Sequence, residues 1–301
     1  MKTIITPIIS TLTLAVLFLT ACGSAPQSSS DALRVLASTT FLADITQNIT
    51  GDRAQVDSLL PIGADPHAYQ AAPSDVAKIA ESDLLIINGL EYEHFIEPLL
   101  KNAGGERMII EATAGLSPRK DAGNGQGVDP HVWLDPNLVV TYVKNIRDGL
   151  IQVDPAGAEI YKTNADQYIA QLNELDAWIV EQVNTIPAER RLLVTNHEAM
   201  GYFAERYGFE IVDTILPSFS SEASASAREI ASAIEAVKSS GAPAIFLGEV
   251  ENTDLADQIA EETGVKVINE LYLESLTAGA PAATYIDMMK HNVTRIVEGL
   301  K

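Results

Sequence analysis

The segment after Gly157 limits most strongly what this chain can fold into, because residues 158–186 contain neither glycine nor proline. Apolar residues recur along it at three- or four-residue spacing, the pattern of an amphipathic helix. They are Ile160, Tyr161, Tyr168, Ile169, Leu172, Leu175, Ile179 and Val183. Pro155 suits a first helical turn and Pro187 ends the helix. We expect a rigid connecting helix over residues 154–186, roughly 45 Å long for about thirty residues.

On both sides of this segment, short β-rich runs alternate with helical ones. Residues 84–87 form a continuous apolar run, typical of a buried parallel strand. The alternation predicts an α/β fold: two α/β lobes, residues 31–153 and 187–301, each with a mainly parallel sheet flanked by helices, joined by the long rigid helix. The expected strands are 33–37, 55–60, 84–87, 108–110, 192–195, 210–215, 244–247 and 265–268. The expected helices are 41–49, 75–81 with Ser74 as its cap, 95–102, 199–207, 224–239, 255–263 and 285–300.

The first thirty residues predict an export signal and a lipid anchor. Lys2 precedes an uncharged apolar run over residues 4–20, about the length of a signal-peptide core. Small residues then precede Cys22, as in a bacterial lipobox, so we expect cleavage after residue 21 and lipidation of Cys22. Residues 23–30 are small and polar and predict a flexible tether. The alternative is an ordinary signal peptide with an incidental cysteine. Cys22 is the only cysteine, which excludes a disulfide within the chain.

The net charge excludes one class of partner. The chain carries a formal charge of −21, and loss of residues 1–21, whose one charged side chain is Lys2, makes it −21 − 1 = −22. Such a chain will not bind nucleic acid electrostatically. Solubility is the plain explanation of the charge. Attraction of cations is the functional alternative, which the net charge alone does not show.

Three of the five histidines follow predicted strands. His67 lies past the second strand, His131 past the fourth, and His197 past the first strand of the second lobe. Ligands of open α/β sheets bind at the carboxyl ends of strands. Neutral imidazoles suit Zn²⁺ and its neighbours, and a carboxylate can complete a four-coordinate site. The sequence therefore predicts a metal site, whereas His94 and His291 are expected to lie outside it.

The sequence does not settle which carboxylates belong to this site. Asp65 and Asp129 each stand two residues before a histidine in Asp-Pro-His, where proline stiffens the backbone. Each aspartate is a candidate to accept the proton of a ring nitrogen that does not bind metal, although turn formation or helix capping is favoured for both. Four glutamates of the last third also follow strands, and periodicity does not choose among them: Glu249, Glu251, Glu270 and Glu274.

The mature chain resembles the zinc/manganese class of ABC transporter substrate-binding lipoproteins, the cluster A-I metal-binding proteins. The matching segments are PIGADPHAY at 61–69, PSD at 73–75, NGLE at 88–91, DPHVWLDP at 129–136, HEAMGYF at 197–203 and LYLESL at 271–276, followed by Tyr285 and Asn292. The resemblance implies two α/β lobes joined by a long helix, a metal at their interface, and the ligands His67, His131, His197 and Glu274. It also implies a membrane permease as partner and no enzymatic activity.

Two positions depart from the pattern of this class. Glu274 stands where the class usually has aspartate, and residues 117–129 lack the histidine-rich loop of many zinc-specific members. The resemblance also bears on the metal, because manganese carriers usually have a carboxylate at the position of His197. Three imidazoles favour Zn²⁺ over Mn²⁺ or iron.

We therefore expect an extracytoplasmic, lipid-anchored monomer that captures one divalent metal, Zn²⁺ in preference to Mn²⁺, and delivers it to a permease after a small lobe movement. A manganese or iron carrier is the alternative within the class. A secreted zinc hydrolase, with Glu198 as base, would need an open coordination position, and an adhesin role has no specific support in the sequence. A carrier of sugars or siderophores would need an aromatic or basic cleft.

Overall fold

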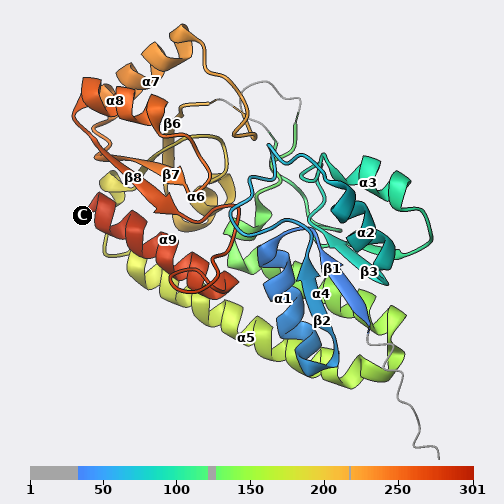
Figure 1. Ribbon diagram of the computed structural model, residues 1–301. Coiled ribbons are helices and arrows are strands. Elements are labelled where there is room, and N and C mark those ends of the chain that lie inside the picture. Colours follow the sequence, from blue (N-terminus) through green and yellow to red (C-terminus); the bar gives the residue numbers. More distant parts are fainter. Residues whose placement is uncertain (1–32, 121–126, 217) are drawn as a thin grey trace, which may run out of the picture. The chain divides into compact units, whose positions relative to one another are not determined.

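Two parallel sheets form the frame of the computed structural model, which describes residues 33–120, 127–216 and 218–301 (Figure 1). Within these residues each sheet has four strands, ordered β2-β1-β3-β4 and β6-β5-β7-β8. The strands are β1 (Arg34–Ala37), β2 (Gln55–Ser58), β3 (Leu84–Ile87), β4 (Met108–Glu111), β5 (Leu192–Thr195), β6 (Glu210–Thr214), β7 (Ala244–Gly248) and β8 (Lys266–Leu271). All eight expected strands are present, and the fold is the predicted pair of α/β lobes. The predicted signal peptide, Cys22 and tether lie outside the described residues.

Helices cover both faces of each sheet. They are α1 (Thr40–Thr50), α2 (Pro73–Glu81), α3 (Ile96–Ala103), α4 (Pro136–Val153), α5 (Ala158–Val183), α6 (Gly201–Tyr207), α7 (Ala227–Ser240), α8 (Asp254–Thr263) and α9 (Tyr285–Leu300). Four short 3₁₀ turns are η1 (Gly51–Arg53), η2 (Val132–Leu134), η3 (Pro155–Gly157) and η4 (Ala188–Arg190). Among the described residues, no helix combines the length and the apolar character that crossing a membrane requires.

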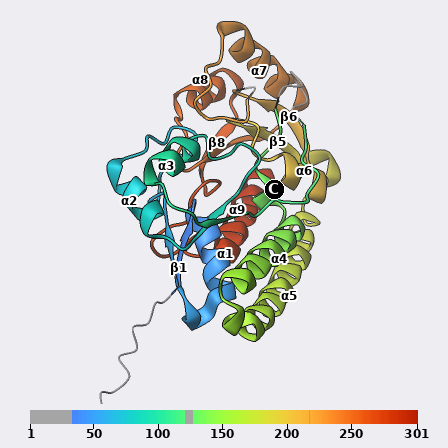
Figure 2. The same ribbon diagram turned by 90° about the vertical axis from the view of Figure 1, so that its right-hand side faces the viewer.

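The long helix α5 joins the two lobes (Figures 1 and 2). It has 26 residues and is shorter than expected, because Pro155–Gly157 forms a 3₁₀ turn and the helix ends at Val183. It packs on α1 and α4 of the first lobe and on α9 of the second. The largest hydrophobic cluster includes buried residues of both lobes and of α5. Smaller clusters lie under α2 and α3 and under α7 and α8.

Two local predictions need correction. Helix α4 is absent from the sequence prediction, although Asp135 accepts the Asn137 N–H at 2.9 Å as its cap and Pro136 stands at its first position. Ser74 does not cap α2. The cap position is Ala72, whose N–H donates to the carboxylate of Asp75 at 2.8 Å, so a side chain from inside the helix holds its start.

Each sheet reverses its strand order beside its first strand, which is where ligands bind in open α/β sheets. In the first lobe this point lies between β1 and β3, and in the second between β5 and β7. The loops that leave the carboxyl ends of the strands of both sheets carry the residues considered next.

Candidate metal centre

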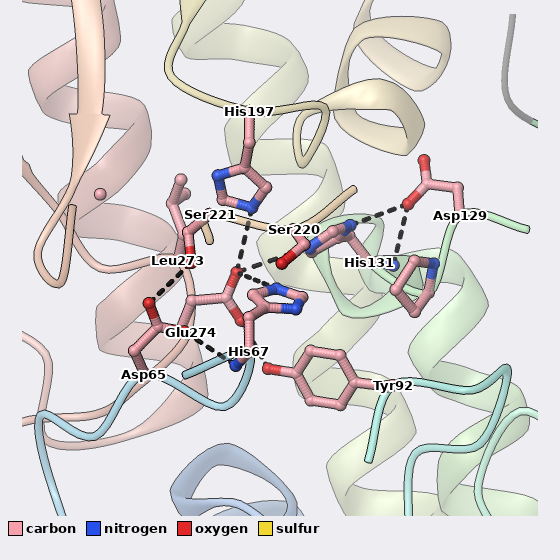
Figure 3. Close-up of polar contacts among 12 residues, drawn as sticks. Asp65, His67, Tyr92, Asp129, His131, His197, Ser220, Ser221, Leu273 and Glu274 are labelled. Carbon is pink, nitrogen blue, oxygen red and sulfur yellow. Dashed lines mark hydrogen bonds and ion pairs between the residues drawn. The ribbon is translucent and has the colours of Figure 1, made fainter. Parts of the chain in front are cut away.

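Four residues from four separate loops meet between the lobes (Figure 3). His67 lies in the loop after β2, His131 directly before η2, His197 two residues after β5, and Glu274 three residues after β8. Their donor atoms all lie within 4.8 Å of one another. Glu274 Oε1 lies 3.8 Å from His67 Nε2 and 3.5 Å from Nε2 of both His131 and His197. The structure thus brings together the four residues that the resemblance implied.

These side chains are buried without partners for the atoms that face the centre. The side chain of His67 is 3% exposed, that of His131 fully buried, and those of His197 and Glu274 1% exposed. The three Nε2 atoms and Glu274 Oε1 make no hydrogen bond. Burying unpaired polar atoms costs free energy unless something satisfies them. Three imidazole nitrogens and one carboxylate oxygen form a donor set that fits a divalent transition metal.

Carboxylates hold two of the rings. His131 Nδ1 donates to Asp129 Oδ1 at 2.9 Å, and His197 Nδ1 donates to Glu251 Oε1 at 2.6 Å. In the neutral imidazole, each bond keeps the proton on Nδ1 and leaves Nε2 as the acceptor, the form that binds metal. Asp65 does not contact the ring of His67: it accepts the backbone N–H of His67 at 2.8 Å and the hydroxyl of Ser221 at 2.6 Å. The ring-orienting role suggested for Asp65 is therefore wrong, and the alternative, turn formation, describes it.

The remaining glutamates of the last third of the chain differ in what they contact. Glu249 accepts the backbone N–H groups of Leu273, Glu274 and Ser275 at 2.8, 3.2 and 2.7 Å, so it fixes the turn that carries Glu274. Burial raises the pKa of Glu249 to about 7. Glu270 pairs with Arg295 at 3.3 Å on the surface.

Sequence reasoning leaves the roles of Glu249 and Glu251 undecided, although Glu249 directly follows β7 and Glu251 lies three residues after it. The other two histidines do not join the four residues of the centre. His94 is exposed, and His291 Nε2 donates to the carbonyl oxygen of Glu270 at 2.8 Å.

Tyr92 is a further residue of this centre that sequence reasoning missed. Its hydroxyl donates to Glu274 Oε2 at 2.5 Å, across the two lobes (Figure 3). Burial, together with the charge of Glu274, raises the pKa of Tyr92 well above its usual value, so the phenol stays protonated. Its position directly after the NGLE segment was the available indication.

The metal-free centre holds protons. Burial alone would lower the pKa of His197, but the hydrogen bond with Glu251 and the nearby carboxylate of Glu274 raise it to about 10. The pKa of His131 is also raised, because Asp129 and Glu274 outweigh its burial. Burial would raise the pKa of Glu274, yet the neighbouring imidazoles hold that pKa well below its usual range. These shifts favour a protonated imidazole beside the Glu274 carboxylate at neutral pH, and a metal at this centre would displace that proton.

Metal affinity is accordingly expected to rise with pH. A metal binds the neutral imidazole, and the pKa of His197 is about 10, so a proton must leave at every pH below that value. Each displaced proton lowers the apparent affinity about tenfold per pH unit of acidification. Titration calorimetry between about pH 6 and pH 8, in buffers of different ionisation enthalpy, measures both the affinity and the protons released. A constant affinity with no proton release would contradict this assignment.

Glu251→Ala is expected to weaken metal binding roughly 10- to 100-fold, the usual cost of losing a hydrogen-bond partner of a ligand. The alanine frees His197 Nδ1 and lets the ring turn. Glu251→Gln keeps an oxygen acceptor and is expected to lose less. Glu270→Ala, the same change at a surface carboxylate, is the matched control, and competition with a metal-binding dye gives the affinities. Equal affinities of the Glu251→Ala and Glu270→Ala variants would exclude the orienting role.

A buried donor set shared by two α/β lobes defines a solute-binding protein whose solute is a metal ion. The model of the zinc-uptake complex component A family, the periplasmic ZnuA proteins, matches residues 35–299, and the chain belongs to this family.

Relatives within this group carry names of different metals. The manganese-binding lipoprotein MntA of Halalkalibacterium halodurans is 36% identical over 284 residues, which cover 93% of each chain. The iron-binding protein YfeA of Yersinia pestis is 32% identical over 277 residues, covering 91% of this chain and 88% of that protein. The solved structure of the periplasmic zinc-binding protein TroA from Treponema pallidum has a TM-score of 0.83 at 28% identity, covering 89% of this chain and 98% of that chain. The names of these relatives therefore support a divalent metal as the solute, but they do not identify which metal it is.

Proposed function

We propose that this chain captures one Zn²⁺ ion outside the cytoplasm through His67, His131, His197 and Glu274, and delivers it to an ABC permease. The observation that carries the proposal is the set of four buried donor atoms that face one point without partners. Three imidazole nitrogens form a nitrogen-rich donor set, which suits zinc better than manganese. Relatives named as lipoproteins and as parts of metal ABC transporters support the permease and the extracytoplasmic location.

The proposal is tested on protein purified from its native envelope without added metal. Elemental analysis is expected to find zinc at one equivalent per chain. The metal-stripped protein is expected to bind one equivalent again in a calorimetric titration. Manganese or iron at one equivalent in the native preparation would overturn zinc while keeping the carrier. Absence of every transition metal, together with no binding on titration, would overturn the carrier itself.

A manganese carrier is the second candidate, and the names of several relatives favour it. In vitro affinity alone does not separate the two, because zinc binds more tightly than manganese at nearly any nitrogen-containing site. The native metal content is therefore the deciding measurement.

A secreted zinc hydrolase has less support. Catalytic zinc keeps a position for water, whereas the fourth donor here is Glu274, with its side chain buried. Membership in a family of solute-binding proteins also supports a carrier. A monomer remains our expectation for the assembly, and an adhesin role has no observation in its favour.

Lipidation of Cys22 is part of the proposal and yields its own prediction. Cys22→Ser is expected to move the protein from the membrane fraction to the soluble extracytoplasmic fraction, because acyl chains supply the anchoring free energy. Metal binding is expected to stay unchanged, since the four proposed ligands lie between residues 67 and 274. Fractionation and immunoblotting compare the variant with the wild-type chain. A serine variant that still needs detergent for release would disprove the anchor.

A further inference from the structure

We propose that Tyr92 sets the metal preference of this centre by restricting Glu274 to a single bond with the metal. The inference rests on the proposed function, because it takes the three histidines and Glu274 as the metal ligands. It concerns a residue that does not itself bind the metal but decides how many donors the metal receives.

The two carboxylate oxygens of Glu274 have different surroundings. Oε1 faces the Nε2 atoms of the three histidines at 3.5 to 3.8 Å and has no hydrogen-bond partner. Oε2 accepts the hydroxyl hydrogen of Tyr92 at 2.5 Å (Figure 3). Glu274 is 2% exposed and Tyr92 1% exposed, so water does not compete for this bond. A hydrogen bond from a phenol to a buried carboxylate is among the stronger kinds.

Aromatic packing holds the phenol in this position. The ring of Tyr92 lies 4.9 Å from that of Trp133 and 5.5 Å from that of His67, measured between centroids. These neighbours leave the hydroxyl directed at Glu274.

The turn before Tyr92 is also fixed. Leu90 and Glu91 have φ of 56° and 61°, a conformation that costs free energy and persists where the surroundings impose it. The buried carboxylate of Glu93 supplies such a constraint, since it accepts the N–H groups of Asn88 and Gly89 at 2.6 and 3.1 Å. Moving the hydroxyl away from Glu274 would require this turn to rearrange.

The number of donors separates zinc from manganese. Zinc is satisfied by four donors in a tetrahedron, whereas manganese favours octahedral, oxygen-rich surroundings. A carboxylate that binds through both oxygens would give manganese a further oxygen donor. Because the phenol hydroxyl binds Oε2, the centre offers three nitrogens and one oxygen. Manganese then lacks the second carboxylate oxygen that would bring its surroundings closer to octahedral.

Tyr92→Phe tests this inference, because it removes only the hydroxyl and keeps the ring between its neighbours. The ratio of the manganese to the zinc dissociation constant is expected to fall about tenfold, the size of one hydrogen bond to a charged group. Tyr168→Phe is the matched control: Tyr168 is buried in α5 and its hydroxyl has no partner among the described residues. Competition titrations with Zn²⁺ and Mn²⁺ give the ratio, and thermal unfolding checks that both variants fold.

X-ray absorption spectroscopy supplies a second, structural measurement on the wild-type protein and on the variant. The zinc-loaded wild-type protein is expected to show three nitrogens and one oxygen, at about 2.0 to 2.2 Å. The manganese-loaded Tyr92→Phe variant is expected to gain an oxygen from Glu274 relative to the manganese-loaded wild type. Two Glu274 oxygens on zinc in the wild type, or an unchanged ratio in Tyr92→Phe, would overturn the inference. If the wild type instead binds neither metal through the histidine cluster, the proposed function fails first, so the two failures are distinguishable.

Discussion

Replacing His197 by alanine is expected to abolish tight zinc binding. The change removes one of four donors and leaves Glu251 as a buried carboxylate whose ring partner is gone. The loss of affinity should exceed the roughly 10- to 100-fold that loss of an outer hydrogen-bond partner costs. His197 and Glu274 come from the second lobe and His67 and His131 from the first, so the change also weakens the link that a metal makes between them.

Calorimetric titration of the metal-stripped protein measures this effect. His291→Ala is the matched control, because His291 lies on α9 outside the cluster and bonds to the carbonyl oxygen of Glu270. We expect that control to bind zinc as the wild type does. Full zinc binding by the His197→Ala variant would remove His197 from the proposed ligand set.

The second large effect is expected at Trp133, the largest fully buried side chain among the described residues. Its ring stacks on that of Phe41 with centroids 4.6 Å apart, and its Nε1–H donates to the carbonyl oxygen of Leu273 at 2.8 Å. Trp133→Ala should lower the free energy of unfolding by about 3–5 kcal/mol, as for other large-to-small core substitutions. Leu273 precedes Glu274, so the change also frees the turn that presents the carboxylate.

Urea unfolding of the metal-free protein measures the loss without the contribution of bound metal. Trp178→Ala on α5 is the control, because Trp178 is only partly buried against the core. A loss at Trp133 no larger than that at Trp178 would contradict the structural role given to Trp133.

The sequence predicted the strands well because short apolar runs at the centre of α/β sheets carry a strong local pattern. Residues 84–87 and 192–195 are strands with the predicted bounds. Helix α4 was missed although its apolar residues recur at helical spacing, so the sequence pattern was sufficient to predict it. The cap of α2 was misplaced because the interaction that starts the helix comes from Asp75 and not from the serine before it.

The histidines of the centre followed from their places after strands, whereas its carboxylates did not. Glu249, Glu251 and Glu274 follow strands of one sheet, Glu270 lies within β8, and only the folded chain separates their roles. The bond between Tyr92 and Glu274 joins residues 182 positions apart in the sequence. No local pattern encodes such a pairing, because it depends on how the loops of both lobes face each other.

The connecting helix α5 has a consequence for how the carrier and the permease interact. Since α5 packs on helices of both lobes and one core includes residues of each, gain or loss of cargo is expected to rearrange loops and leave the scaffold almost unmoved. The metal-loaded and the metal-free protein would then present nearly the same surface to the permease. The metal-free protein should therefore compete with the metal-loaded protein for the permease. Metal import should slow when the carrier is in large excess over the metal.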